Sequence, residues 1–101
     1  VVLGPRLPAS SLSPEVLANC ATTLIVNGDE VDRGSGALCP LGGPAPALAW
    51  LANHLNSRGL QLQRGQLVIT GVTCKSNAFA AGDHIRATFA GLGSVETRIK
   101  V

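Results

Sequence analysis

Residues 42–55 read Gly-Gly-Pro-Ala-Pro-Ala-Leu-Ala-Trp-Leu-Ala-Asn-His-Leu and contain the clearest helix signal in this chain of 101 residues. The two prolines suit the first turn of a helix, where the amide donors have no partner inside the helix. Apolar residues then recur at intervals of three and four, which predicts one buried face. Gly59 is a natural end signal. We therefore expect a helix over about residues 44–58, with Trp50 mostly in the core.

Runs of β-branched and alternating residues lie on both sides of this helix. Ala21–Val26 is one such run and leads into Asn27-Gly28, a strong hairpin signal because a type I′ turn needs positive φ at both central positions. The sequence predicts a single domain, residues 1–101, with an α+β fold: a β-rich roll of mostly antiparallel strands with one main helix packed on them. The five or six expected strands are residues 1–3, 21–26, 30–33, 66–70 (mostly buried), 84–89 and 94–101.

The composition limits the classes of function. Charged residues make up only 14% of the chain, against a usual share of about 25%. We therefore expect apolar surface to be buried in a homo-oligomer or against a missing N-terminal half. The scattered basic residues and three aromatics argue against nucleic-acid binding, and no apolar run approaches the roughly 18 residues of a membrane span. Three widely spaced cysteines are typical of reduced, mostly buried thiols in a cytoplasmic protein.

The densest group of acidic residues is Asp29, Glu30 and Asp32, and carboxylates are the ligands that Mg²⁺ and Ca²⁺ prefer. Asp29 sits beside the tight turn, however, and the alternation predicts that Glu30 and Asp32 share one strand face. A solvated hairpin is therefore the favoured interpretation of this group.

Two histidines invite a catalytic interpretation. No serine or cysteine has the local context of a nucleophile elbow, so Asp83-His84 is better explained as a turn aspartate followed by an outward-facing histidine. No histidine or carboxylate stands at metal-binding spacing around His54, which favours a partly buried histidine over a ligand. The runs Gly34-Ser35-Gly36 and Gly91-Leu92-Gly93 are interpreted as turns rather than phosphate loops. We assign no catalytic and no metal-ligating residue.

An ordered series of short motifs extends along nearly all of the chain. The most specific are Ala-Trp-Leu-Ala-Asn at 49–53, the predicted strand ending in Ile69-Thr70-Gly71, and the hairpin Gly91-Leu92-Gly93. The series resembles the C-terminal portion of the 2-keto-4-pentenoate hydratase and 4-oxalocrotonate decarboxylase group, within the fumarylacetoacetate hydrolase superfamily. The other matching motifs are Val2-Leu3-Gly4, Asn27-Gly28, Gly34-Ser35-Gly36-Ala37, Leu41-Gly42 and Ala81-Gly82-Asp83.

This resemblance implies a lyase of aromatic meta-cleavage catabolism that hydrates or decarboxylates 2-keto acids with Mg²⁺ or Mn²⁺. In the group the metal is held by a Glu-x-Glu pair and a further carboxylate, all upstream of the matching region. This sequence contains no Glu-x-Glu, so no metal ligand carries over and no cofactor is expected in this chain alone. Four residues match segments of the pocket that contact substrate, and we expect them to bind it here: Leu3, Gly4, Thr70 and Gly71.

The preferred hypothesis is a truncated homologue of these enzymes, inactive alone because the metal-binding half is missing. The alternative is a non-catalytic module for small-molecule binding or oligomeric assembly, with a pocket near Thr70, Gly71 and Trp50. A third hypothesis is that a partner chain supplies the carboxylates. A small 2-keto acid is the expected ligand.

Overall fold

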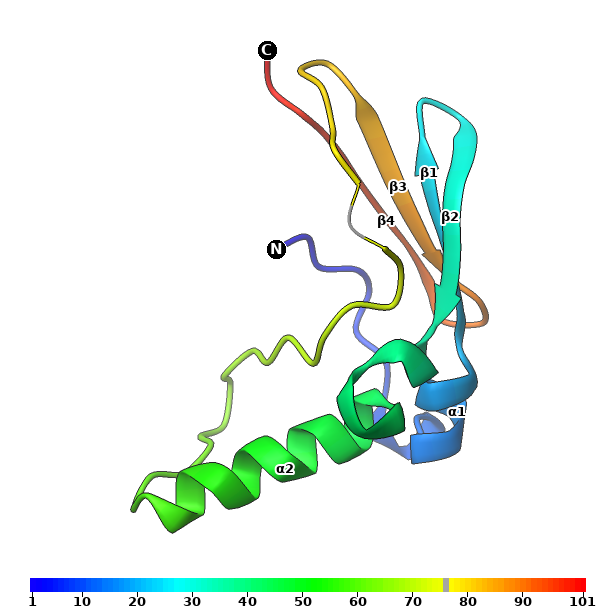
Figure 1. The fold of residues 1–101 in the computed structure, drawn as a ribbon. Helices are drawn as coiled ribbons and strands as arrows, with labels where there is room; N and C mark the ends of the chain where they lie inside the picture. Colours follow the sequence, from blue (N-terminus) through cyan, green and yellow to red (C-terminus); the bar gives the residue numbers. More distant parts are fainter. Residues whose placement is uncertain (76) are drawn as a thin grey trace.

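One four-stranded antiparallel sheet dominates the computed structural model, which describes residues 1–75 and 77–101 (Figure 1). Its order is β2-β1-β3-β4, so the two hairpins lie side by side. This arrangement confirms the α+β class and the two expected hairpins, although β2 is longer than the predicted 30–33 and β4 ends at Arg98 rather than at residue 101. The strands are β1 (Ala21–Val26), β2 (Asp29–Ser35), β3 (His84–Phe89) and β4 (Gly93–Arg98); the helices are α1 (Pro14–Asn19), α2 (Pro44–Ser57) and the 3₁₀ turns η1 (Ala9–Ser11), η2 (Gly36–Leu38) and η3 (Pro40–Gly42).

The β1–β2 hairpin turns at Asn27-Gly28 with φ of 51° and 84°, as the sequence predicts. The register then shifts: Ile25 lies opposite Glu30, whereas Leu24 lies opposite Asp32. Because consecutive residues of a strand face opposite sides, the expectation that Glu30 and Asp32 share a face is wrong. The extra residue between them is a β-bulge, which alternation alone does not reveal.

Helix α2 begins and ends where local signals place it. Pro44 is its first residue, and the helix stops at Ser57. Gly59 has φ of 74°; its amide donates to the Asn56 carbonyl at 3.1 Å, and the Leu60 amide donates to the Leu55 carbonyl at 2.9 Å. These two bonds form a Schellman motif, so the boundaries expected from sequence are confirmed to within one residue.

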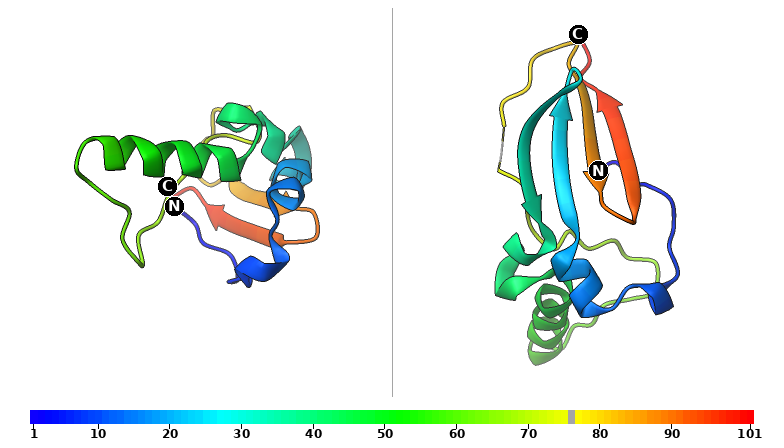
Figure 2. Two further views of the ribbon diagram at one scale, coloured as in Figure 1. Left: turned by 90° about the horizontal axis from the view of Figure 1, so that it is seen from below. Right: turned by 90° about the vertical axis from the view of Figure 1, so that its right-hand side faces the viewer.

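The packing of α2 differs from the expectation. The helix makes its main contacts with α1 and η3 rather than with the strands, and it extends away from the lower end of the sheet (Figures 1 and 2). Trp50 is 56% exposed and stacks on the exposed His54 ring at 4.9 Å, so neither the expected core position of Trp50 nor the partly buried His54 is correct. The helix has apolar residues at core spacing, but within this chain it covers no sheet.

Two expected strands are absent among the described residues. Residues 1–3 are exposed and have no strand partner, and residues 66–70 form an extended segment outside the sheet. Leu67 and Ile69 are 71% and 75% exposed, which contradicts the prediction of a mostly buried strand. A strand needs a neighbour to satisfy its backbone groups, and none of the described segments pairs with this one.

The core is small for a chain of this length. Among the described residues, only Cys20, Cys39 and Ile85 are buried apolar residues, with Thr22 as a buried polar one. The accessible surface is 7248 Å², whereas a compact monomer of 10.3 kDa would expose about 5,300 Å². The radius of gyration is 15.0 Å, against about 13 Å for a compact domain of this size. About 1,900 Å² of surface is therefore left open beyond that of a self-contained domain.

No helix in the described ranges is both long enough and apolar enough to cross a bilayer. All three cysteines are free thiols, with Cys20 and Cys39 buried and Cys74 half-buried, as expected of reduced thiols. Burial raises the pKa of the Cys20 thiol, which keeps that side chain protonated and unreactive.

Candidate functional site

Thr70 and Gly71 lie in a pocket of about 360 Å³ where α1, the start of β1 and η2 meet the segment 68–73. Thr70 also lines a second, apolar hollow of about 430 Å³ beside Trp50. Gly71 has φ of 133°, and a β-carbon there would lie 2.6 Å from Cδ of Pro40. Only glycine fits this position, because the backbone of Gly71 packs directly against the Pro40 ring at the pocket wall.

The segment 70–74 has no secondary structure of its own and is held by buried side chains. The Thr22 hydroxyl donates to the Thr73 carbonyl at 3.1 Å and lies 3.3 Å from the Cys74 sulfur. The Cys39 sulfur lies 3.9 Å from the Thr70 hydroxyl. Thr22 and Cys39 are each only 3% exposed. These contacts fix Thr70 at the pocket, and sequence reasoning did not find Thr22 or Cys39 because neither belongs to a recognisable motif.

Gly34 allows the same segment to approach the sheet. A β-carbon at Gly34 would lie 1.6 Å from the Thr73 carbonyl oxygen, and one at Gly36 would lie 1.9 Å from the Leu17 carbonyl oxygen. Gly34 belongs to β2 rather than to a turn. The run Gly34-Ser35-Gly36 therefore serves close packing of backbones, a role that the sequence interpretation as a turn missed.

Leu3 and Gly4 lie in a different pocket, of about 230 Å³, against the β3–β4 hairpin. A β-carbon at Gly4 would be 3.1 Å from Cγ1 of Val95, so the N-terminal segment lies directly on β4. Phe89 and Leu92 line both this pocket and the one that contains Thr70 and Gly71. The structure thus places the two pairs of candidate residues on either side of these two apolar side chains rather than in one cavity.

The acidic residues are engaged in structural bonds. Glu30 accepts from the Arg33 guanidinium at 3.0 Å, which lowers the pKa of Glu30, and Asp32 accepts from the Lys75 amide. The bulge places Glu30 and Arg33 on the same face of the sheet, because their partners Ile25 and Thr23 share one. The solvated hairpin is confirmed as the better interpretation of this group.

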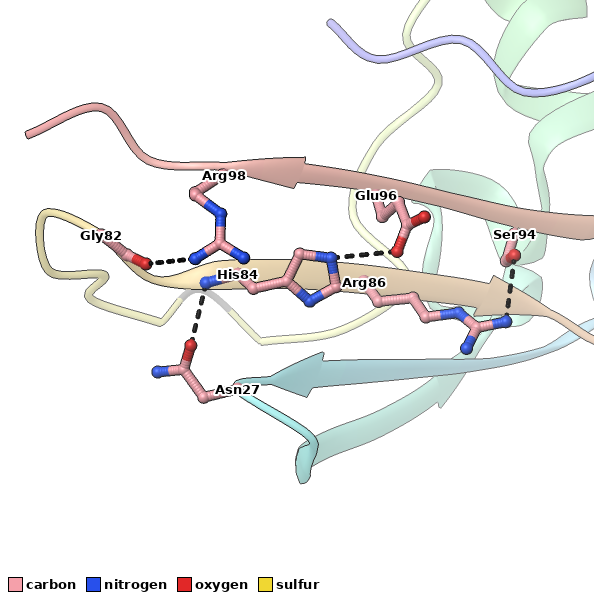
Figure 3. Close-up of polar contacts among 7 residues, drawn as sticks. All are labelled: Asn27, Gly82, His84, Arg86, Ser94, Glu96 and Arg98. Atoms are coloured by element: carbon pink, nitrogen blue, oxygen red, sulfur yellow. Dashed lines mark hydrogen bonds and ion pairs between the residues drawn. The ribbon is translucent and has the colours of Figure 1, made fainter.

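Asp83 and His84 also have separate structural partners. The Ala80 amide at 2.8 Å, followed by the Asn27 side-chain amide at 2.8 Å, lowers the pKa of the Asp83 carboxyl. The His84 ring instead lies 2.9 Å from a Glu96 carboxylate oxygen on β4 (Figure 3). Asp83 does not orient the imidazole, so this pair is not a catalytic dyad, in agreement with the sequence interpretation.

The face that carries His84 is polar along its length. Arg98 donates to the Gly82 carbonyl at 3.1 Å, and Arg86 lies 3.5 Å from the Ser94 hydroxyl on the same side (Figure 3). The opposite face carries Ile85 and Phe89 and adjoins the pockets. The two faces therefore divide the sheet into an exposed polar side and an apolar side on which the candidate site lies.

Comparison with known proteins decides the family. Residues 1–100 match the family model described as fumarylacetoacetate (FAA) hydrolase C-terminal. The chain belongs to this family. Within it, the chain is 42% identical over 79 residues to a 2-keto-4-pentenoate hydratase of Burkholderia vietnamiensis, covering 78% of this chain and 30% of that enzyme. It is 42% identical over 72 residues to a 4-oxalocrotonate decarboxylase of Pseudomonas putida, and the match covers 71% of this chain and 27% of that enzyme.

A solved structure shows the same fold. The 4-oxalocrotonate decarboxylase from Pseudomonas putida G7, complexed with magnesium and adipate, matches with a TM-score of 0.75 and 36% identity over 82% of this chain and 31% of that one. The same enzyme complexed with calcium and acetate matches with a TM-score of 0.75. This chain thus spans about a third of the length of its relatives in the FAA hydrolase family, less than the half that the resemblance in sequence implied.

The residues that the structure describes do not fit a divalent metal. Among residues 1–75 and 77–101, no three His, Cys, Asp or Glu side chains gather closely enough to hold an ion. The hairpin carboxylates Glu30 and Asp32 point to opposite faces of the sheet and are bonded elsewhere. The described part of the chain therefore offers pocket walls rather than a metal centre.

Proposed function

We propose that this chain is the C-terminal portion of a metal-dependent 2-keto acid hydratase or decarboxylase of aromatic meta-cleavage catabolism. It supplies part of the substrate pocket and is inactive alone, because the metal-binding carboxylates belong to a part of the fold outside this chain. The observation that supports this proposal is the shared fold with 4-oxalocrotonate decarboxylase over 82% of the chain, combined with coverage of only 31% of that enzyme.

The chemistry of the site agrees with a small 2-keto acid as the ligand. The Thr70 hydroxyl can donate a hydrogen bond to a carboxylate or keto oxygen, and Gly71 lies beside it in the lining of the same pocket. Leu3 and Gly4 line the neighbouring pocket, and Phe89, which lines both pockets, offers apolar surface to the carbon chain of a ligand. These residues bind and orient the ligand; none of them is placed to move a proton.

Steady-state hydration of 2-hydroxypenta-2,4-dienoate with Mg²⁺ tests the proposal. The purified chain should show no turnover above the uncatalysed rate. A fusion that joins the remaining two thirds of the Burkholderia vietnamiensis hydratase to this chain should show Mg²⁺-dependent turnover. In that fusion Thr70→Val should raise KM, while the control Thr88→Val, on β3 outside the pockets, should not. Mg²⁺-dependent hydration by the chain alone would overturn the proposal.

The apolar hollow beside Trp50 favours a second candidate, a small-molecule binding or oligomeric assembly module without catalysis. The hollow is lined by Leu41, Trp50, Ile69 and Thr70 and is large enough for a small ligand. Titration of the chain with 2-oxopent-4-enoate should then quench Trp50 fluorescence saturably. An unchanged emission spectrum up to millimolar ligand would count against the small-molecule form, and a monomer in sedimentation would count against the assembly form.

A further inference from the structure

The segment Gln66–Thr70 has the sequence of a strand but no partner. Its residues Leu-Val-Ile-Thr are typical of strands buried on both faces. In the described part of the chain, the backbone groups of residues 67–70 take part in no backbone hydrogen bond. The side chains of Leu67 and Ile69 are 71% and 75% exposed. An extended, apolar and unpaired segment of this kind is a template for another strand.

The segment belongs to a wider apolar surface. Two hollows of about 430 Å³ each lie along α2, and they share Leu51, Val68 and Ile69. Together they make one groove between α2 and the segment, which returns from the far end of α2 toward the sheet (Figure 1). Charged side chains are absent from the residues that line the two hollows. The occupant must therefore present apolar side chains together with unpaired backbone groups.

The area and the relatives indicate what this occupant is. The chain exposes about 1,900 Å² more than a compact domain of its mass, which is more than twice the roughly 800 Å² that each partner buries in a standard protein interface. The relatives carry about twice this chain's length outside the matching region. A part of the same fold is the one occupant that supplies apolar surface of this extent and also explains why Thr70, at the end of the segment, lies at the candidate site.

We propose that Gln66–Thr70 is a strand of the complete enzyme, hydrogen-bonded to a strand from the two thirds of the fold outside this chain, with Leu67 and Ile69 buried against that part. This inference rests on the proposed function. Strand pairing would hold the chain up to Thr70, whereas the contacts to Thr22 and Cys39 already hold residues 70–74, so that assembly of the two parts completes the pocket.

Hydrogen–deuterium exchange measures the pairing directly. In the isolated chain the amides of residues 67–70 should exchange at nearly the intrinsic rate. In the fusion with the remaining two thirds of the Burkholderia vietnamiensis hydratase, every second amide of this stretch should slow by at least about 100-fold, because one neighbouring strand bonds alternate amides and bonded amides exchange only through opening. The connector amides of residues 60–63 should change little. Unprotected amides at 67–70 in a folded fusion would overturn the proposal, as would protection in the isolated chain that grows with dimer formation.

Matched charge substitutions test the burial. Leu67→Lys and the control Gln61→Lys add the same charge at exposed positions of the isolated chain, and neither should change its Tm. In the fusion Leu67→Lys should abolish the protection at 67–70 and Gln61→Lys should not. If the amides at 67–70 stay equally protected in both variants of the fusion, the proposal is overturned. If the fusion does not fold, amide exchange is measured instead in the intact Burkholderia hydratase, at the stretch that matches residues 67–70. Fast exchange of those amides would overturn the proposal that this stretch is a strand.

The strand and the proposed function can fail separately. A fusion that is protected at 67–70 but shows no Mg²⁺-dependent hydration contradicts the function and leaves the strand in place. A fusion that turns over substrate with unprotected amides contradicts the strand and leaves the function in place.

Discussion

The sheet and the α2 arm, which we define as α2 with the returning residues 58–70, are stabilised in different ways. Each strand of the sheet pairs with a neighbour within the chain, and the central strands carry Thr22 and Ile85 at 3% and 8% exposure. The arm satisfies only the hydrogen bonds of its helix and leaves its apolar side chains open, with none of α2 buried. The sheet is thus stabilised by contacts within this chain. The α2 arm has apolar residues at the spacing of a buried element, but no other part of the described chain covers them.

The largest expected effect separates the two regions directly. Ile85→Ala removes a buried side chain at the centre of the sheet and should lower the free energy of unfolding by about 2–4 kcal/mol. Trp50→Ala in the arm should cost less than about 1 kcal/mol in the isolated chain, because Trp50 is half exposed. Urea denaturation of both variants measures the difference. Equal losses would show that the arm is packed in solution after all.

A substitution at the junction of sheet and pocket should have the next largest effect. Gly34→Ala would place a β-carbon 1.6 Å from the Thr73 carbonyl oxygen, which must displace the segment 70–74 at a cost of about 1–3 kcal/mol. Ser35→Ala, the neighbouring residue, is the control and should be close to neutral. Thermal unfolding of the two variants compares their Tm values. A Gly34→Ala variant with unchanged Tm would mean that residues 70–74 do not lie against β2.

A smaller effect is expected when the bond that anchors the same segment is removed. Thr22→Val leaves the Thr73 carbonyl without its buried donor and should lower the free energy of unfolding by about 1–2 kcal/mol. Thr23→Val, on the opposite face of β1, is the matched control. Faster exchange of the amides around Thr73 in Thr22→Val would show that the bond also holds the pocket wall, and unchanged exchange would contradict this role.

The smallest effect concerns the far end of the sheet and depends on pH. The pKa of Asp83 is lowered in the folded state from its ordinary value of 3.8 by the Ala80 amide and then the Asn27 side chain. A lowered folded pKa adds stability above pH 3.8 that is lost as the pH falls through the folded pKa. Asp83→Asn should therefore flatten the dependence of Tm on pH below about 4. The control Asp29→Asn, at the same end of the sheet, should keep the slope of Tm against pH. An unchanged slope in Asp83→Asn would exclude a contribution of Asp83 to stability.

The elements that sequence predicted correctly are those set by neighbours along the chain. The Asn27-Gly28 turn, the α2 boundaries with Gly59, and the alternation of β3 and β4 depend on φ preferences, caps and pleat. The candidate residues Thr70 and Gly71 were found through a motif, but their anchors Thr22 and Cys39 were not. The pocket depends on the contacts of Thr22 with Thr73 and of Cys39 with Thr70. These residues lie about 50 and 30 positions apart, and contacts at such separations leave no periodic signal in the sequence.

The predictions that failed required a partner surface. Trp50 and residues 66–70 have the composition of a core, and pattern reasoning assigned them to one. The structure shows Trp50, Leu67 and Ile69 exposed, because burial depends on what is packed opposite and not on the side chain alone. The error at Glu30 and Asp32 has a different origin, since one bulged residue reverses the face of everything after it.

The sequence by itself determined the family, the hairpins and the main helix, because turn, cap and pleat preferences are local and the matching motifs lie in order along the chain. Tertiary structure alone decided that Leu3 and Gly4 face Thr70 and Gly71 across Phe89 and Leu92. It also decided that α2 extends away from the sheet. Both are questions of which surfaces meet, and the free energy of that choice comes from apolar area buried between distant segments.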